Sequence, residues 1–206
     1  MYLNLKLERQ LWEQGYQRVI GLDEVGRGAL AGPVTVGGVI INPGLPKIPR
    51  ELQGVRDSKK MTALQRERTY QTLMHAGCLI SATASSSARV VDRVGIVRAV
   101  ELAMIQVVKK LSPADFAILD GDFSLPLSIH QCSLVRADDQ VFSVAAASII
   151  AKVRRDRLMC YYHSLYSRYG FQKHKGYGTE RHRQAIGTFG FCPIHRKTFK
   201  SSWQKK

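Results

Sequence analysis

Short apolar runs alternate with longer segments of helical period along most of this 206-residue chain. The short runs are rich in aliphatic and β-branched residues, which favours strands, and the longer ones repeat apolar residues every three or four positions. Strands are expected at 18–22, 34–41, 78–84, 116–119 and 133–135, and helices at 3–14, 62–75, 87–111, 141–169 and 180–189. The alternation predicts one α/β domain over residues 1–206, with a mixed central sheet flanked by helices on both faces.

Turn residues divide these segments. Gly26, Gly28 and Gly32 with Pro33 separate the first two strands and predict a hairpin. Thr62 is an expected N-cap of the helix that follows it. Beyond Gly170 the chain becomes loop-rich and basic, so we expect a helical and loop-rich C-terminal extension at about 170–206 that binds substrate.

Positive charge is concentrated in the C-terminal quarter of the chain. There are 31 Lys and Arg against 16 Asp and Glu, a formal charge of +15. Residues 152–206 contain 14 of the basic residues and two of the acidic ones, whereas residues 1–151 contain 17 and 14. A one-sided excess this large favours a nucleic-acid partner over a merely solvated surface, because phosphate neutralisation dominates nucleic-acid affinity.

Other classes of protein are disfavoured by the sequence. No apolar run approaches the roughly 20 residues that span a membrane, and the N-terminus MYLNLKLERQ is unlike a signal peptide. We therefore expect a cytoplasmic protein with no membrane partner. The four cysteines lie far apart without a C-x-x-C pair, which predicts neither a disulfide framework nor a zinc site.

Acidic residues stand at the ends of three expected strands, although the chain as a whole is basic. They are Asp23 and Glu24 after the first strand, Asp120 after the fourth, and Asp138 and Asp139 after the fifth. One sheet can bring these ends together, and clustered carboxylates repel one another unless cations neutralise them. Oxygen ligands of this kind suit Mg²⁺ or Mn²⁺ joined by substrate phosphate. The pattern therefore predicts two-metal phosphoryl transfer.

Each acid also has a purely structural alternative. Asp23 can cap a turn, Asp120 can form a tight turn with Gly121, and Asp138 or Asp139 can cap the next helix. The residues alone leave the set open, because the chain holds three further candidates: Asp57, Asp115 and Asp122.

The segment GLDEVGRGALAGPV, residues 21–34, closely resembles the opening motif of the type 2 ribonucleases H. Further blocks follow in the order and approximate spacing of that family and cover most of the chain. They are RDSKKM (56–61), ILDG (118–121), RADDQVFSVAAASIIAKVRRDR (136–157), HKGYGT (174–179) and HRKTF (195–199). A match in several blocks is far more specific than one motif, and it is similar to the bacterial branch, the ribonucleases HII.

The resemblance implies a ribonuclease H-like fold and a particular set of acids. The four acids of the family, its catalytic residues and ligands of two Mn²⁺ or Mg²⁺ ions, match Asp23, Glu24, Asp120 and Asp138. The family usually has Lys-Gly-Asp at the last position, and Arg136-Ala137-Asp138 keeps the basic residue and the acid. The resemblance thus selects Asp138, with Asp139 as a neighbour that can cap the helix.

Substrate contacts are also implied. Glycines let the backbone of the turn Gly26-Arg27-Gly28 approach a nucleotide closely. The family uses this turn, with a tyrosine matching Tyr177, to sense the RNA-to-DNA junction through a 2′-hydroxyl. Candidate phosphate contacts are Lys59, Lys60, Lys152 and Arg155. We expect phosphate binding or local packing, and not acid–base catalysis, from His174, His182 and His195.

These expectations describe an endonuclease that hydrolyses the RNA strand of RNA–DNA hybrids and cuts 5′ to ribonucleotides embedded in duplex DNA. In-line attack leaves 5′-phosphate and 3′-hydroxyl ends, and the implied role of this monomer is removal of misincorporated ribonucleotides and RNA primers. The alternatives are a non-catalytic basic nucleic-acid-binding module and a structure-specific metal-dependent DNA nuclease. Metal-dependent cleavage of a duplex with one ribonucleotide, compared with an all-DNA duplex, separates the three.

Overall fold

The chain folds around a mixed five-stranded sheet. The computed structural model describes residues 3–199. The strand order is β3-β2-β1-β4-β5, in which β1, β2 and β3 pair antiparallel while β1, β4 and β5 pair parallel. The strands are β1 (Val19–Val25), β2 (Val34–Ile41), β3 (Leu79–Ser86), β4 (Phe116–Asp120) and β5 (His130–Leu134). The expected hairpin between the first two strands is confirmed.

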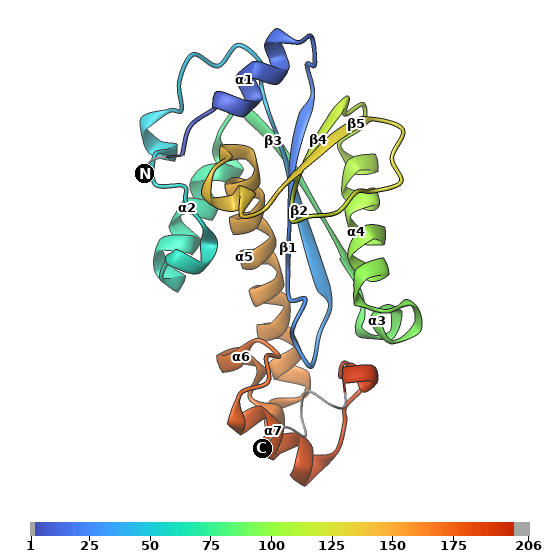
Figure 1. Cartoon of the computed structure of the whole chain (residues 1–206). Coiled ribbons are helices and arrows are strands. Elements are labelled where there is room, and N and C mark those ends of the chain that lie inside the picture. The colour runs from blue at the N-terminus through green and yellow to red at the C-terminus, as the bar shows by residue number, and fades with distance from the viewer. Residues whose placement is uncertain (1–2, 200–206) are drawn as a thin grey trace.

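Helices cover both faces of this sheet. α5 packs on β1 and β2, and α4 packs on β2 and β3 from the other side (Figure 1). The α-helices are α1 (Lys6–Glu13), α2 (Ala63–His75), α3 (Ala88–Val94), α4 (Ile96–Lys110), α5 (Phe142–Leu165), α6 (Phe171–His174) and α7 (Glu180–Phe189). Short 3-10 turns are η1 (Arg50–Leu52), η2 (Ser58–Lys60), η3 (Ala137–Asp139), η4 (Ser167–Tyr169) and η5 (Lys197–Phe199). The expected α/β architecture is confirmed.

Glycines in the sheet let α5 lie very close to it. A Cβ on Gly37 would lie 2.3 Å from the carbonyl oxygen of Ala147, and a Cβ on Gly21 would lie 2.6 Å from backbone atoms of Ser143. Both distances are shorter than any normal contact of a Cβ atom, so these positions require glycine. The N-terminal half of α5 is consequently held at a fixed height above β1 and β2.

Apolar side chains fill the space between the sheet and its helices. On one side Leu73 of α2 and Ile150 of α5 are fully buried, and on the other side Met104 and Val107 of α4 are. Burying a side chain of this size stabilises a fold by about 1.5–3 kcal/mol. The two layers together fix the position of the strand residues that carry the acids.

Several element boundaries agree with those predicted from sequence. β2 spans 34–41 and α7 spans 180–189, as expected. The side chain of Thr62 accepts a hydrogen bond from the backbone N–H of Gln65, which confirms the predicted N-cap of α2.

Other boundaries differ for identifiable reasons. The segment 87–111 forms two helices, because Gly95 adopts a φ of 80° and ends α3. The helix predicted at 141–169 ends at Leu165, before the 3-10 turn η4. The strand predicted at 133–135 instead spans His130–Leu134, an edge strand whose polar sequence hides its period.

Residues 166–199 form a C-terminal lobe beyond the end of α5 (Figure 1). Its apolar cluster includes Met159 of α5, Phe171 and Ala185, and Ala31 from the loop after β1 also joins it. Residues 200–206 of the expected 170–206 extension lie outside the described residues. Within residues 3–199, no helix is both long and apolar enough to cross a membrane.

Gly37→Ala is expected to lower the free energy of unfolding by about 1–3 kcal/mol, because the new Cβ would overlap the carbonyl oxygen of Ala147. Gly54→Ala is the matched control, since a Cβ there meets nothing within 4 Å. Urea unfolding followed by circular dichroism measures both changes. A Gly37→Ala protein as stable as the control would contradict the close packing of α5.

Candidate metal centre and substrate loop

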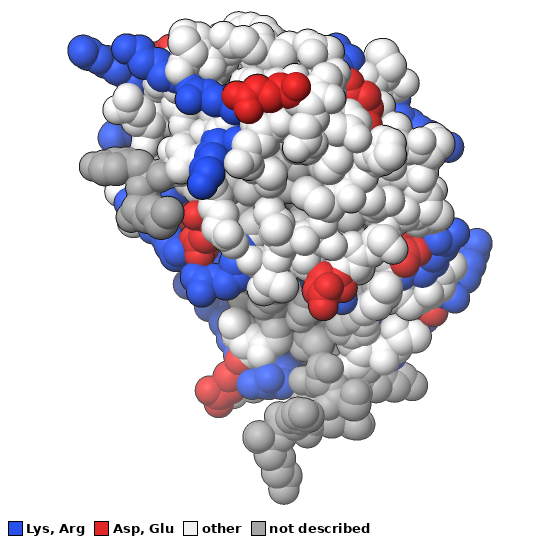
Figure 2. All heavy atoms as spheres, turned by 45° about the horizontal axis from the view of Figure 1, so that its top comes forward, with Lys and Arg blue, Asp and Glu red and all other residues white. Residues whose placement is uncertain are grey.

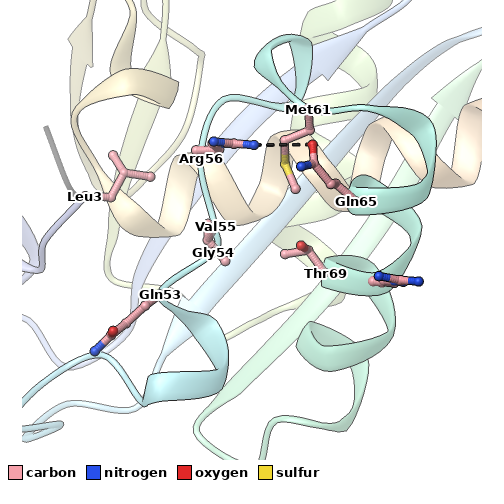
Figure 3. A pocket seen from close by; sticks show the side chains of 9 residues that line it. Leu3, Gln53, Gly54, Val55, Arg56, Met61, Gln65 and Thr69 are labelled. Atoms are coloured by element: carbon pink, nitrogen blue, oxygen red, sulfur yellow. Dashed lines mark hydrogen bonds between the residues drawn. The ribbon is translucent and has the colours of Figure 1, made fainter.

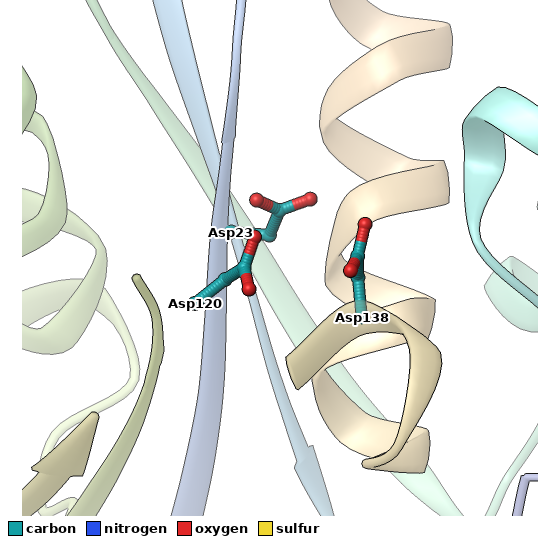
Figure 4. Close-up of side chains that lie close together, drawn as sticks. All are labelled: Asp23, Asp120 and Asp138. Carbon is teal, nitrogen blue, oxygen red and sulfur yellow. The ribbon is translucent and has the colours of Figure 1, made fainter. Parts of the chain in front are cut away.

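Three carboxylates from separate parts of the chain meet at one place. Asp23 lies on β1, Asp120 ends β4, and Asp138 lies in η3 (Figure 4). One oxygen from each carboxylate lies within 4.8 Å of the others. β1 and β4 are parallel neighbours with Leu22 opposite Leu119, so their next residues carry the first two acids side by side.

Hydrogen bonds fix the orientation of these carboxylates. The Asp120 Oδ1 accepts from the backbone N–H of Ala137 at 2.7 Å, which ties the end of β4 to η3 and thereby places Asp138. The Asp23 Oδ1 accepts from the backbone N–H of Glu24 at 2.7 Å. The Ser148 hydroxyl of α5 lowers the pKa of the Asp23 carboxyl, although burial and neighbouring charges outweigh that effect.

The cluster is electrostatically unfavourable without a cation. Asp23 is 3% exposed, and burial raises its pKa well above the ordinary value, with the charges of Glu24, Asp120 and Asp138 adding to the effect. Burial also raises the pKa of Asp138, and Asp120 adds to it while Lys59 opposes it. A site with these properties takes up protons or binds cations.

Glu24 stands beside the three clustered acids. The sequence predicted that Asp23 and Glu24 follow the first strand, but β1 continues to Val25, because Val25 still pairs with Thr35 of β2. Successive residues of a strand point to opposite faces, so the two acids diverge. Burial raises the pKa of Glu24, Arg27 opposes this, and the charge of Asp120 adds to it.

The two carboxylate oxygens of Glu24 have different environments. Its Oε1 lies 3.4 Å from Arg27 Nη1, whereas its Oε2 is buried and has no hydrogen-bond partner among residues 3–199. A buried carboxylate oxygen is normally paired, so this one is unsatisfied. Hard carboxylate oxygens are the donors that Mg²⁺ and Mn²⁺ prefer, and the four acids therefore fit divalent ions.

Lysines from η2 border the cluster. Asp57 caps this turn by accepting from the backbone N–H of Lys59 at 2.8 Å. The Lys59 Nζ lies 3.2 Å from Asp138 Oδ2, and Lys60 pairs with Asp139. Both lysine side chains are largely exposed, so these pairs contribute little to stability and the ammonium groups can also face a phosphate.

Asp139 points to basic partners and not to the cluster. It pairs with Lys60 and with Arg136, whose Nη2 lies 2.5 Å from Asp139 Oδ2, and these contacts lower its pKa. α5 begins after Val141 without a side-chain cap, so the predicted capping role of Asp139 is wrong. The geometry favours Asp138 as the acid that joins Asp23 and Asp120.

The turn Gly26-Arg27-Gly28 lies at the end of the β1–β2 hairpin. Gly26 has a φ of 89°, and a Cβ there would lie 2.1 Å from Arg155 Nε, so the turn requires glycine. A Cβ on Gly28 would meet nothing within 4 Å, so this part of the turn is open.

Two buried guanidinium groups hold this hairpin loop from inside. Arg155 of α5 donates to the carbonyl oxygens of Pro33 at 2.8 Å, Ala31 at 3.1 Å and Lys175 at 2.8 Å. Arg155 is fully buried, so its prediction as a phosphate contact is wrong. A helical pattern of basic residues does not reveal which arginine turns inward.

Arg196 is the second of these groups, and no sequence pattern predicted its role. It donates to the carbonyl oxygens of Gly32 at 3.0 Å and Arg27 at 2.8 Å. Burial lowers its pKa to about 9. The residue belongs to the block HRKTF, so the family resemblance marked its position without indicating its function.

Tyr177 lies on the same loop assembly. Its ring is 5.4 Å from the Arg155 guanidinium carbon and 5.9 Å from Lys152 Nζ, and it remains partly exposed. The preceding Gly176 carbonyl accepts from the backbone N–H of Leu30 at 2.8 Å. The structure thus joins the segment carrying Tyr177 to the loop that contains Gly26-Arg27-Gly28.

Two surface hollows differ in their relation to these residues. The first, of about 470 Å³, lies beside α2 and has no acidic residue in its lining (Figure 3). Arg56 Nη2 donates a hydrogen bond to Gln65 Oε1 across this hollow at 3.3 Å. The second, of about 340 Å³, is lined by Arg27, which pairs with Glu24, and by Gly121, which follows Asp120 in the chain.

Charge is not evenly distributed over the surface. Figure 2 shows a face on which uncharged residues occupy most of the area, with Lys and Arg mainly toward its margins and single acidic residues among them. The basic residues of this face therefore do not form one continuous patch.

Asp120→Asn is expected to raise Tm in EDTA by about 2–4 °C, because it removes about 1 kcal/mol of repulsion between the Asp120 carboxylate and its neighbours. The asparagine Oδ1 can still accept from Ala137. The folded protein holds Asp23 with a raised pKa, so stability falls as pH rises above the ordinary aspartate value, and the variant should reduce that fall.

Divalent metal should reverse the order of stability. Mn²⁺ or Mg²⁺ is expected to raise Tm of the unchanged protein and to have much less effect on Asp120→Asn. The control is Asp122→Asn, which alters an exposed acid two residues away. Thermal scans with and without metal measure the difference, and equal responses of all three proteins would contradict the metal assignment.

Comparison with known proteins identifies the family. The family model described as Ribonuclease HII matches residues 20–206. The curated ribonuclease HII of Syntrophobacter fumaroxidans is 45% identical over 196 residues, which are 95% of this chain and 82% of that protein.

Solved structures share the fold. The ribonuclease HII in a complex with PCNA from Archaeoglobus fulgidus superposes with a TM-score of 0.74 at 24% identity, covering 91% of this chain and 97% of that one. Bst-RNase HIII in complex with Mn²⁺ has a TM-score of 0.64 at 18% identity, covering 85% and 63%. The match of the family model to nearly the whole chain, with relatives this similar, means that the chain belongs to the ribonuclease HII family.

Proposed function

We propose that this protein is a metal-dependent endonuclease that hydrolyses the RNA strand of RNA–DNA hybrids and cuts 5′ to ribonucleotides embedded in duplex DNA. The observation that carries the proposal is the meeting of Asp23, Asp120 and Asp138 within 4.8 Å, in a chain of the ribonuclease HII family. The products are 5′-phosphate and 3′-hydroxyl ends.

Asp23, Glu24, Asp120 and Asp138 hold two divalent ions, Mn²⁺ or Mg²⁺, in this proposal. When bound, such ions supply an activated water and stabilise the leaving oxygen in phosphoryl transfer. The buried, unpaired Glu24 Oε2 and the raised pKa of Asp23 support the assignment, because both describe carboxylates arranged for a cation. The hydrogen bond from the Ala137 N–H to Asp120 keeps the two proposed ligands Asp120 and Asp138 in place before substrate binds.

Lys59 and Lys60 are proposed to bind the phosphates next to the cut. Lys59 already lies 3.2 Å from Asp138, so a phosphate that approaches the acids meets its ammonium group. Burial lowers the pKa of Lys59, but the nearby acids Asp138 and Asp23 raise it by more, so Lys59 stays charged. A charged lysine there neutralises the approaching phosphate.

Substrate choice is proposed to depend on Gly26-Arg27-Gly28 and Tyr177. The inner side of the turn is occupied by Arg155 and Arg196, and the open position of Gly28 allows a nucleotide to approach the backbone. Backbone groups that a nucleotide can approach so closely can bind its 2′-hydroxyl, and a tyrosine ring can stack on the next sugar.

The remaining parts of the proposal concern the whole protein. Residues 170–206 act as a basic substrate-binding extension of the single catalytic domain, and their nine Lys and Arg against one acidic residue support this. The protein acts in the cytoplasm as a monomer and removes misincorporated ribonucleotides and RNA primers.

Cleavage of a labelled duplex with one embedded ribonucleotide tests the proposal. The unchanged protein should cut it 5′ to the ribonucleotide in Mn²⁺ or Mg²⁺ and leave an all-DNA duplex intact. Asp138→Asn should lose cleavage by at least about a hundredfold, since it removes a proposed ligand, while Asp139→Asn, which alters a residue outside the cluster, should retain most of it. Binding should largely survive both changes.

The possible results separate the alternatives. Retardation of the duplex without cleavage would favour a binding module, and equal cutting of all-DNA duplex would favour a DNA nuclease. Loss of cleavage in Asp139→Asn but not in Asp138→Asn would reassign the fourth ligand.

Affinity for the duplex is expected to fall steeply between about 50 and 200 mM salt, because phosphate contacts release counterions. Lys173→Gln in α6 should lower the slope of log affinity against log salt by about one. Lys109→Gln is the control, since it lies at the end of α4 away from the C-terminal lobe (Figure 1). A flat salt response of the unchanged protein would contradict phosphate-dominated binding.

A further inference from the structure

Three histidines lie inside the C-terminal lobe, away from solvent. His174, His182 and His195 are all buried. The rings of His174 and His182 stack with centroids 4.4 Å apart, and Phe171 contacts both edge-on. The structure confirms local packing for these residues. Packing alone would not require imidazole rings, because phenylalanine or leucine fills such a cluster without burying polar atoms.

The hydrogen bonds of two of these rings form a directed chain. His195 Nδ1 lies 2.9 Å from the backbone N–H of Cys192 and 3.3 Å from the carbonyl oxygen of Cys192, and the shorter contact, in which Nδ1 accepts, places the proton of His195 on Nε2. His195 Nε2 then donates to His182 Nε2 at 3.1 Å, which leaves the proton of His182 on Nδ1. That Nδ1–H donates to the carbonyl oxygen of Tyr177 at 2.9 Å. Each ring nitrogen has one defined role.

Both rings remain neutral near neutral pH. Burial lowers the pKa of His182 and that of His195 to about 4. The chain of donors described above needs this neutral state, since a second proton on His182 would place two N–H groups against each other.

The backbone around Tyr177 is held from several directions. Its N–H donates to the carbonyl oxygen of His174 at 2.9 Å, and its carbonyl also accepts from the backbone N–H of Thr179 at 2.8 Å. The N–H of Gly176 donates to His174 Nδ1 at 3.2 Å. Local bonds set the turn, whereas the bond from His182 connects it to residues 192–195.

We infer that His182, oriented by His195, is a positioning residue that fixes Tyr177 for recognition of the RNA-to-DNA junction. The inference rests on the proposed function, in which the ring of Tyr177 contacts the nucleotide after the ribonucleotide. His182 does not touch substrate in this view. It acts through the carbonyl of Tyr177, whose ring then stays against Arg155.

The test compares two substrates and uses a double-mutant cycle. Junction preference is defined as kcat/KM for a DNA duplex with one ribonucleotide divided by kcat/KM for an RNA–DNA hybrid. His182→Phe keeps a ring in the cluster but removes the donor to Tyr177, and it should lower this preference by roughly ten- to a hundredfold. Tyr177→Ala should lower it at least as much.

The double variant is the decisive measurement. If His182 acts through Tyr177, His182→Phe should cause little further loss in a protein that already carries Tyr177→Ala. His182→Asn should restore most of the preference, because its side-chain amide can place an N–H near the former Nδ1 position. The inference would be overturned if the losses of junction preference from His182→Phe and Tyr177→Ala multiplied in the double variant. An unchanged junction preference in His182→Phe would also overturn it.

Two controls separate positioning from stability. Phe171→Leu loosens the same cluster without removing any of these hydrogen bonds, so it should lower Tm and leave junction preference unchanged. His75→Phe changes an exposed histidine on α2 and should alter neither. A Phe171→Leu protein that loses junction preference like His182→Phe would overturn the inference, because loosening would then suffice.

Failure of the positioning role and failure of the proposed function give different results. An unchanged preference in Tyr177→Ala would reject the role of Tyr177 in the proposed function. If Tyr177→Ala lowers the junction preference and His182→Phe leaves it unchanged, only the positioning role of His182 is rejected. If His182→Phe does not fold, His195→Leu removes the donor to His182 and is expected to give a smaller loss of the same kind, again without further loss on top of Tyr177→Ala.

Discussion

Repulsion among carboxylates is the constraint that the architecture has to overcome. Asp23 is buried where its ionised form is unfavourable, and it cannot move away because β1 is hydrogen-bonded on both sides. The close approach of α5 to Gly21 and Gly37 closes the remaining side and brings Ser148 to Asp23. Packing energy thus holds a group of charges that would separate in a looser fold, and the same group is consequently ready for cations.

Two regions with different supports make up the candidate site. The acids are held by the sheet and by the bond from Ala137 to Asp120, whereas the glycine turn is held by guanidinium groups bonded to its carbonyl oxygens. Arg155 and Arg196 are buried donors with three and two carbonyl acceptors, and they stiffen the turn from inside. In the proposed function, cutting by the acids and ribose choice by the turn therefore depend on separate contacts, which substitutions can perturb separately.

The pattern of residues predicted the fold class, and the family resemblance selected four acids, of which the structure brings three together. Strands with clear aliphatic runs, such as β2, and helices with a cap, such as α2, were predicted because local chemistry determines them. The predicted end of the first strand was wrong, since pairing with β2 extends β1 beyond its apolar run, through Asp23 and Glu24 to Val25. The inward turn of Arg155 depends on acceptors distant in the chain, and no local pattern reveals such contacts.

Arg196 binds carbonyl oxygens 164 and 169 residues earlier in the chain. Synthesis proceeds from the N-terminus and segments fold as they emerge, so β1, β4 and α5 leave the ribosome well before residue 196 does. The segments that carry the carboxylates are therefore complete before the second inner support of the glycine turn exists. Of the contacts that hold the turn from inside, those of Arg196 are the last that a growing chain can form.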